Sequence, residues 1–171
     1  MAMPEWKTAQ MTTSIALRPL AVEDASEMAR VLADPQLYVF TGGEPPSREQ
    51  LAQRYAVQCR GQSEDGLEKW LNELVLLGPE QLIGYVQATI PVGSDTAEIA
   101  WVIGTPWQGS GYGLRAARLF VDQLAARGVR RIIAHIHPRH EASIRIAQRL
   151  GMSPTDVDVD GETRWSGCTQ Q

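Results

Sequence analysis

The chain has little cysteine and no spacing typical of a metal site. Only two of its 171 residues, Cys59 and Cys168, are cysteines, and they lie far apart. This spacing predicts neither a disulfide framework nor a zinc site. His135 and His137 fall on one face of a predicted strand, but no third Cys, Asp or Glu follows at zinc-like spacing. We therefore expect a reduced, cytoplasmic protein that uses no metal.

Long apolar runs and excess positive charge are also missing. No apolar run approaches the roughly 20 residues that a membrane-spanning helix needs. The first residues, MAMPEWKTAQMTTS, lack the apolar stretch of a secretion signal, and we expect residues 1–13 to be a flexible, tag-like end. The net charge of −4 argues against a nucleic-acid-binding surface. The sequence thus favours neither a membrane nor a nucleic acid as partner.

No repeat, low-complexity tract or linker divides the chain, so we expect one domain over residues 14–166 and a second flexible end at 167–171. The residue patterns predict a mixed, mostly antiparallel sheet with helices packed on it, an α+β fold. Three strands separated by short turns indicate a meander, a helix then crosses to a parallel strand, and Asp160-Gly161 marks a hairpin. Strands are expected at 14–20, 70–77, 82–90, 96–104, 129–138 and either side of 160–161, and helices within 22–35, 48–59, 111–127 and 140–152.

The segment TPWQGSGYGLRAARLF, residues 105–120, carries glycines at alternate positions just before a predicted helix. Glycine lets the backbone approach a ligand closely, and a helix start offers free N–H groups and a positive dipole end. The combination predicts a phosphate cradle. A P-loop is excluded because Leu114 and Arg115 follow Gly113 where Lys and Ser or Thr are required. A dinucleotide-binding fold is disfavoured, because the next strand ends in His-Ile-His-Pro without the ribose-binding acid. A tight turn that binds no ligand is the remaining alternative.

The loop and a second motif resemble the GNAT superfamily of acyl-CoA-dependent N-acetyltransferases. Gln108–Gly113 matches the family's Gln/Arg-x-x-Gly-x-Gly/Ala pattern. AEIAWVIGTPWQGSGYG and, about thirty residues later, HIHPRHEASIRIAQRLGM are similar to the branch that includes the ribosomal-protein N-acetyltransferases. The opening IALRPLAVEDASEM also resembles this family, so the likeness runs from about Ile15 to Trp165.

The resemblance implies a GNAT-like fold, with helices on both faces of the twisted sheet and two strands splayed around acetyl-CoA. Main-chain amides of the loop would bind the pyrophosphate, and the exposed edge of the preceding strand would bind the pantetheine arm. The coenzyme-binding residues that it implies are Val102, Ile103, Gln108, Gly109, Ser110, Gly111, Tyr112, Gly113, Arg115, His140 and Ser143. The chain departs from the family at His140, where Asn is frequent, and at Ala147, where many members carry a tyrosine acid.

Two residues are the candidates for proton transfer. Glu98 shares a strand face with Ala100 and Val102, and the resemblance implies a base acting through water; a surface glutamate at the strand edge is the alternative. Ser143 matches the serine of the second motif and is the candidate acid; the alternative is a serine that only caps the helix. A lysine-like amine costs about 4.6 kcal/mol to deprotonate at pH 7, and a peptide α-amine about 1 kcal/mol. A strongly basic acceptor therefore needs a dedicated base.

Five residues are candidates for the acceptor side, with a satellite core as the alternative for the aromatic ones. They are Tyr38, Phe40, Glu44, Trp101 and His137. We expect an acetyl-CoA-dependent N-acetyltransferase acting on a protein N-terminal α-amine or a small-molecule amine, as a monomer or homodimer. A non-catalytic acyl-CoA-binding or sensing domain is the alternative. The negative net charge favours cationic acceptors.

Overall fold

The computed structural model describes residues 14–169, and the ends expected to be flexible at 1–13 and 170–171 lie outside the described residues. The elements follow the predicted order. In chain order they are β1 (Ile15–Pro19), η1 (Val22–Asp24), α2 (Ala25–Val31), η2 (Pro35–Tyr38), α3 (Arg48–Gln58), β2 (Glu68–Leu77), β3 (Gln81–Pro91), β4 (Thr96–Ile103), η3 (Thr105–Trp107), α4 (Tyr112–Ala126), β5 (Arg131–Ile136), α5 (Glu141–Arg149), β6 (Ser153–Val159) and β7 (Glu162–Cys168).

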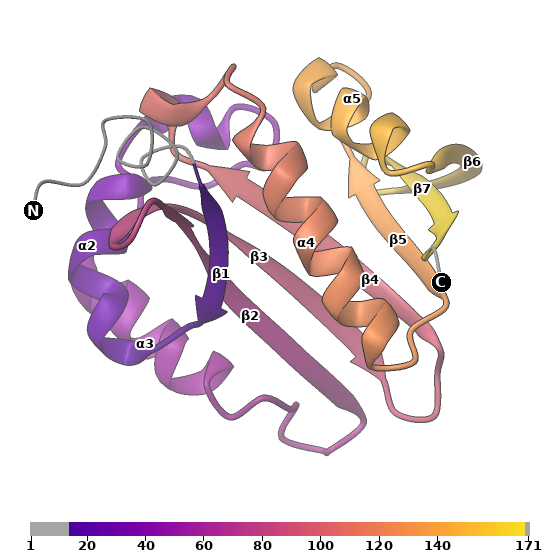
Figure 1. Ribbon diagram of the computed structural model, residues 1–171, viewed down its shortest axis with the longest axis horizontal. Helices are drawn as coiled ribbons and strands as arrows, with labels where there is room; N and C mark the ends of the chain where they lie inside the picture. The colour runs from indigo at the N-terminus through magenta and orange to yellow at the C-terminus, as the bar shows by residue number, and fades with distance from the viewer. Residues whose placement is uncertain (1–13, 170–171) are drawn as a thin grey trace, which may run out of the picture.

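Residues 14–169 build one seven-stranded sheet in the order β1-β2-β3-β4-β5-β7-β6. Its neighbours pair antiparallel except β4 and β5, which α4 connects as a parallel crossover. Helices α4 and α5 cover one face of the sheet, and α2 with α3 covers part of the other (Figure 1). The predicted α+β class, with helices on both faces, is confirmed.

Local sequence signals explain where the elements begin and turn. The predicted capping box opens α3, because the Ser47 hydroxyl accepts from the Gln50 N–H and the Gln50 side chain accepts from the Ser47 N–H. The β6–β7 hairpin turns at Asp160 and Gly161, whose φ angles of 53° and 83° are the left-handed pair of a type I′ turn. Few residues other than glycine, asparagine and aspartate adopt the left-handed region, so the Asp160-Gly161 pair is a specific turn signal.

The prediction of a flexible end from residue 167 is wrong for Gly167, Cys168 and Thr169. Strand β7 runs through Cys168 and pairs with β5. Thr169 donates its backbone N–H to the Arg130 carbonyl at 3.0 Å and its hydroxyl to the Val129 carbonyl at 2.8 Å. The residues of this segment are small or polar and show no apolar alternation that would predict a strand. The segment is ordered by its backbone pairing with β5.

The parallel pair β4–β5 stays together for only three residues. Register is recorded between Thr96–Glu98 and Arg131–Ile133, whereas β4 continues to pair with β3 as far as Ile103. Beyond Glu98 the two strands therefore diverge, as Figure 1 shows. Helix α4 packs its apolar stripe on the sheet in front of this gap, and residues such as Phe120 and Leu124 are almost fully buried there. Each such side chain contributes about 1.5–3 kcal/mol of stabilisation.

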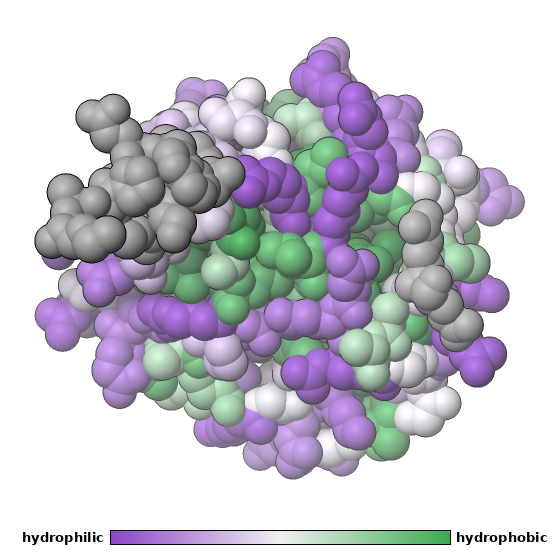
Figure 2. Space-filling model, in the orientation of Figure 1, coloured by the Kyte–Doolittle hydropathy of each residue, from purple (hydrophilic) through white to green (hydrophobic). Residues whose placement is uncertain are grey.

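A hollow between β1 and α4 is the main apolar feature of the face shown in Figure 2. It lies on the α4 side of the sheet, because Ile15 and Leu17 pack against the same core cluster as Phe120. Side chains alternate between faces along a strand, so Ile99, Trp101 and Ile103 belong to this side, whereas Glu98 and Val102 belong to the other. The hollow is thus separate from the face that carries Glu98.

Candidate functional site

The glycine loop leads into α4 in a left-handed conformation. Gly109 and Gly111 have φ angles of 78° and 79°, which side chains rarely adopt, and a Cβ added at either would meet nothing within 4 Å. Gly111 is the N-cap, and the first helical bond runs from the Arg115 N–H to the Gly111 carbonyl at 3.1 Å. The N–H groups of Tyr112 to Leu114 precede this bond and have no intrahelical acceptor. An open backbone with free donors at a helix start suits an anionic oxygen ligand.

Gly113 has a different role from the two loop glycines. A Cβ there would lie 3.0 Å from Ile146 Cδ1 and 3.5 Å from Ile103 Cγ1. Helix α4, helix α5 and the end of β4 therefore meet at this residue, and its missing side chain allows their close approach. This contact sets α5 beside the gap between β4 and β5.

Polar side chains around the loop fix it and supply positive charge. Gln108 Nε2 donates to the Ile103 carbonyl at 2.8 Å, which ties the loop to the end of β4. The Arg115 guanidinium lies 6.0 Å from the centre of the Tyr112 ring. Ser110 and Arg115 are exposed. A cation thus stands on the first turn of the helix whose amides are free.

The edge of β4 next to the gap is defined by the phase of its pairing with β3. Gly104 N–H donates to the Ile83 carbonyl at 2.8 Å. Hydrogen-bonding directions alternate along an antiparallel strand, so the N–H and C=O of Val102, two residues earlier, also point towards β3. A Cβ added to Gly84 of β3 would collide with the Val102 carbonyl oxygen, which agrees with that direction. The backbone groups of Trp101 and Ile103 consequently face the gap. Of the predicted pair Val102 and Ile103, only Ile103 has this orientation, and the sequence prediction did not include the Trp101 backbone.

Glu98 is the last β4 residue that is paired with β5. Its side chain begins a line of three polar side chains that runs from β4 across β5 to β7, on the open face of the sheet opposite α4. Its Oε1 lies 2.9 Å from His135 Nδ1 on β5, and Arg164 Nε on β7 donates to His135 Nε2 at 3.2 Å. The Glu98 side chain is 52% exposed and that of His135 is 15% exposed. A carboxylate with one oxygen held and the other accessible can accept a proton from an incoming group.

Ser143 lies in the first turn of α5 and contacts the His140 ring. The His140 side chain caps the helix: its Nδ1 accepts from the Ser143 N–H at 3.5 Å, and its Nε2 lies 3.3 Å from Ser143 Oγ. Burial, and secondly the nearby His137, lowers the pKa of His140 from its ordinary value of 6.5. A neutral ring with Nδ1 accepting carries its hydrogen on Nε2, which leaves the serine hydroxyl hydrogen available to another acceptor.

Phe40 connects the loop after η2 to this histidine pair. Its ring stacks on His140 with centres 4.7 Å apart and lies 5.2 Å from the His137 ring. The predicted acceptor-side residues Phe40 and His137 are therefore brought together with His140 and Ser143. The structure does not gather the other three around them in the same way. The Tyr38 hydroxyl donates to the Leu32 carbonyl at 2.9 Å, Glu44 is exposed, and the Trp101 side chain packs against the α4-side core.

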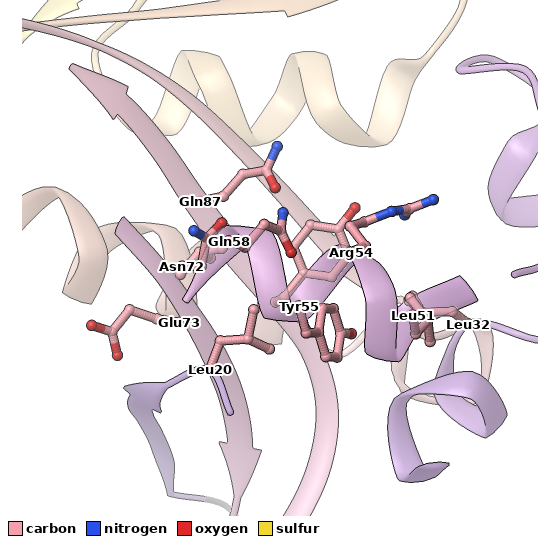
Figure 3. A pocket seen from close by; sticks show the side chains of 11 residues that line it. Leu20, Leu32, Leu51, Arg54, Tyr55, Gln58, Asn72, Glu73 and Gln87 are labelled. Carbon is pink, nitrogen blue, oxygen red and sulfur yellow. The ribbon is translucent and has the colours of Figure 1, made fainter. Parts of the chain in front are cut away.

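A small cavity lies between α3 and strands β2 and β3, on the Glu98 side of the sheet. Its volume of about 40 Å³ has room for water molecules but not for a complete acceptor. Figure 3 shows Gln58, Asn72 and Gln87 around it, while the Glu73 carboxylate points away. Burial raises the pKa of both Tyr55 and Tyr85, which line the same cavity. The cavity therefore lies between α3 and the sheet face that also carries Glu98.

Two contributors to the site, His135 and Arg164, were missed as site residues by sequence reasoning. Alternation alone puts His135 on the same face as Ile133, the partner of Glu98, so a signal for His135 existed. Arg164 is a neighbour only because β7 returns antiparallel beside β5, opposite His135. That register is not readable from the local pattern of the hairpin.

Further features of the described chain bear on the expected function classes. Across residues 14–169, no three His, Cys, Asp or Glu side chains lie close enough together to hold a metal ion. No helix described within this range is both long and apolar enough to cross a membrane. Cys59 and Cys168 are exposed free thiols.

Comparison with known proteins places this geometry in a family. Residues 14–153 match the family model described as an acetyltransferase (GNAT) domain. The uncharacterized N-acetyltransferase YnaD of Bacillus subtilis is 30% identical over 89 residues, which are 52% of this chain and 51% of YnaD. The chain thus spans about half the length of this curated relative.

Solved structures show the same fold at low sequence identity. RimJ of Mycobacterium smegmatis in complex with CoA-disulfide superposes with a TM-score of 0.76 at 17% identity, over 92% of this chain and 83% of that one. Spermidine N-acetyltransferase of Vibrio cholerae in complex with CoA and spermine gives a TM-score of 0.74 at 17% identity, over 91% and 95% of the two chains. The family model covers most of the chain, and the fold, the glycine loop and the diverging strands agree with it: this protein belongs to the GNAT acetyltransferase family.

Proposed function

We propose that the protein transfers an acetyl group from acetyl-CoA to a primary amine by direct attack in a ternary complex. The observation that carries this proposal is the gap between β4 and β5. The free amides of the glycine loop open at its α4 side, and the Glu98 carboxylate stands where the strands part, on the other face of the sheet. CoA-disulfide is bound in the cited Mycobacterium structure and CoA in the cited Vibrio structure, which supports acetyl-CoA as the cosubstrate here.

The residues of the loop and of the β4 edge would bind the coenzyme. In this proposal the amides of Gly109 to Gly113 bind the diphosphate, and Arg115 adds positive charge. The gap-facing backbone of Trp101 and Ile103 pairs with the pantetheine amides as an added strand would. Gln108 holds the loop against Ile103 and so keeps these two parts of the site in register.

Glu98 and Ser143 take different parts in the proposed reaction. The amine nitrogen attacks the thioester carbonyl, the C–S bond breaks, and the amine loses a proton towards Glu98, directly or through water. The departing thiolate accepts a hydrogen bond from the Ser143 hydroxyl, whose hydrogen is left available by His140, and takes up its proton from solvent after it leaves. A basic small-molecule amine depends on Glu98 more than a protein α-amine does, because its deprotonation at pH 7 costs about 3.6 kcal/mol more.

The test is the release of free thiol from acetyl-CoA over a panel of amines that includes polyamines, amino acids and short peptides. We expect turnover with at least one class, and Glu98→Gln should lower kcat about 10²- to 10⁴-fold, the usual contribution of a general base. The affinity for acetyl-CoA should stay within a factor of about two in this variant, because Glu98 does not belong to the loop. Loss of affinity at unchanged kcat would refute the assigned role.

One observation favours a second candidate, an acyl-CoA-binding or sensing domain without catalysis. Ala147, at the position where many family members carry a tyrosine acid, is fully buried in the core, so no hydroxyl acid stands there. Stoichiometric binding of acetyl-CoA without turnover on any amine of the panel would select this candidate.

A further inference from the structure

The Glu98 carboxylate contacts His135, which in turn contacts Arg164, and neither residue has a role in the chemistry proposed above. His135 and Arg164 lie on neighbouring strands, directly opposite each other in the β5–β7 register. Their contacts run in one line from the Arg164 guanidinium through the imidazole to Glu98 Oε1, with separations of 3.2 Å and 2.9 Å. The line ends at the point where β4 leaves β5.

The order of hydrogens along this line follows from the chemistry of arginine. Arg164 Nε always carries a hydrogen and cannot accept, so it must face a lone pair on His135 Nε2. A neutral imidazole has one hydrogen, which is therefore on Nδ1 and is donated to Glu98 Oε1. A second hydrogen on Nε2 would point at the Arg164 N–H and bring two cations together.

We infer that His135 is a positioning residue for Glu98 and that Arg164 fixes its tautomer. The inference rests on the proposed function, in which Glu98 accepts the proton of the amine. His135 cannot itself be the base, because Arg164 occupies its only lone pair. Its Nδ1–H instead binds one oxygen of a half-exposed, otherwise rotatable glutamate and leaves the second oxygen towards the open sheet face.

Nitrogen NMR of the imidazole tests the hydrogen order without any assay of transfer. In the full-length protein at neutral pH, the His135 ring should be the neutral Nδ1–H tautomer. Because Glu98 alone would keep the hydrogen on Nδ1, the effect of Arg164 is tested in a Glu98→Ala background, where Arg164→Met should release the ring to a mixture in which Nε2–H dominates, as in free imidazole side chains. Arg131→Met is the matched control, because Arg131 is an exposed arginine on the same face of β5, two residues before Ile133. A wild-type ring that is Nε2–H or doubly protonated would overturn the inference.

Kinetics on the best acceptor then test the positioning. His135→Phe should lower kcat about tenfold or more and leave the KM for acetyl-CoA within about twofold. His135→Asn, whose amide can donate from nearly the Nδ1 position, should recover most of the loss. Unchanged kcat in His135→Phe, or equal losses in both variants, would contradict positioning through Nδ1–H. If the wild-type protein transfers acetyl to no amine, the proposed function and the positioning role fail together, while the tautomer result still stands.

Discussion

At the scale of single residues, the proposed chemistry depends on which groups carry hydrogens. Ser143 Oγ is 3.3 Å from His140 Nε2, and the ring takes the Ser143 N–H on its other nitrogen. The serine N–H is thus capped by His140, and its hydroxyl hydrogen stays available for the proposed transfer. The two sequence interpretations of Ser143, as an acid and as a helix-start residue, are compatible in this geometry.

Ser143→Ala should lower kcat about a hundredfold if the hydroxyl donates a hydrogen bond to the leaving thiolate. The backbone N–H that His140 accepts is still present in the variant, so the cap survives and stability should change by less than about 1 kcal/mol. Ser26→Ala, an exposed serine in α2, is the control. Wild-type kcat for Ser143→Ala in steady-state assays would leave Ser143 with a structural role alone.

His140 should also make the stability of the protein depend on pH. Burial and then His137 lower its pKa in the folded state, so the unfolded chain takes up a proton first as the pH falls. Its contribution is therefore complete above the ordinary pKa of about 6.5 and is lost as the pH falls towards the lowered folded value. Urea midpoints measured from about pH 7.5 to about pH 5 should fall less steeply for His140→Asn than for wild type. Identical slopes would show that His140 is not the responsible group.

At the scale of elements, both ends of α4 use left-handed glycines, but for different purposes. Gly111 precedes the first turn with φ 79°, and Gly128 follows the last with φ 89°. An added Cβ meets nothing within 4 Å at either position. Only the N-terminal one adjoins free amides, since the first intrahelical donor is Arg115.

Gly111→Ala and Gly128→Ala should therefore cost similar stability, about 1–2 kcal/mol each, by forcing a side chain into the left-handed region. Only Gly111→Ala should also weaken acetyl-CoA binding, by about tenfold, because relaxation of the strain turns the loop amides. Urea unfolding and calorimetric titration measure the two effects separately. Equal affinities in the two variants would refute the role of the loop conformation.

The elements themselves were predictable from the sequence because each carries its own signal. The capping box at Ser47, the glycines around α4 and the Asp160-Gly161 turn define their elements locally, and β4 was predicted within one residue. What escaped prediction depends on partners distant in the chain. The pairing of His135 with Arg164, the direction of the Val102 carbonyl and the ordering of Thr169 are all set by a neighbouring strand.

At the scale of the whole molecule, the proposed coenzyme-binding groups and the proposed base lie on opposite sides of the sheet. The α4 side presents the loop, the free amides and Arg115, whereas the other face presents Glu98, His135 and Arg164. The net charge of −4 therefore does not describe the open face, where a carboxylate is balanced by a guanidinium. Acceptor choice will follow these local groups more closely than the overall charge.

The central claim is that the loop before α4 grips the diphosphate of acetyl-CoA and so directs its thioester into the gap. Calorimetric titration of the full-length protein with acetyl-CoA, and separately with acetyl-pantetheine, which lacks the diphosphate, tests this claim most directly. We predict one binding site per chain for acetyl-CoA and affinity at least about a hundredfold weaker for acetyl-pantetheine, since several charge-assisted hydrogen bonds are lost. No heat with acetyl-CoA from folded protein, or equal affinity for the two compounds, would contradict it.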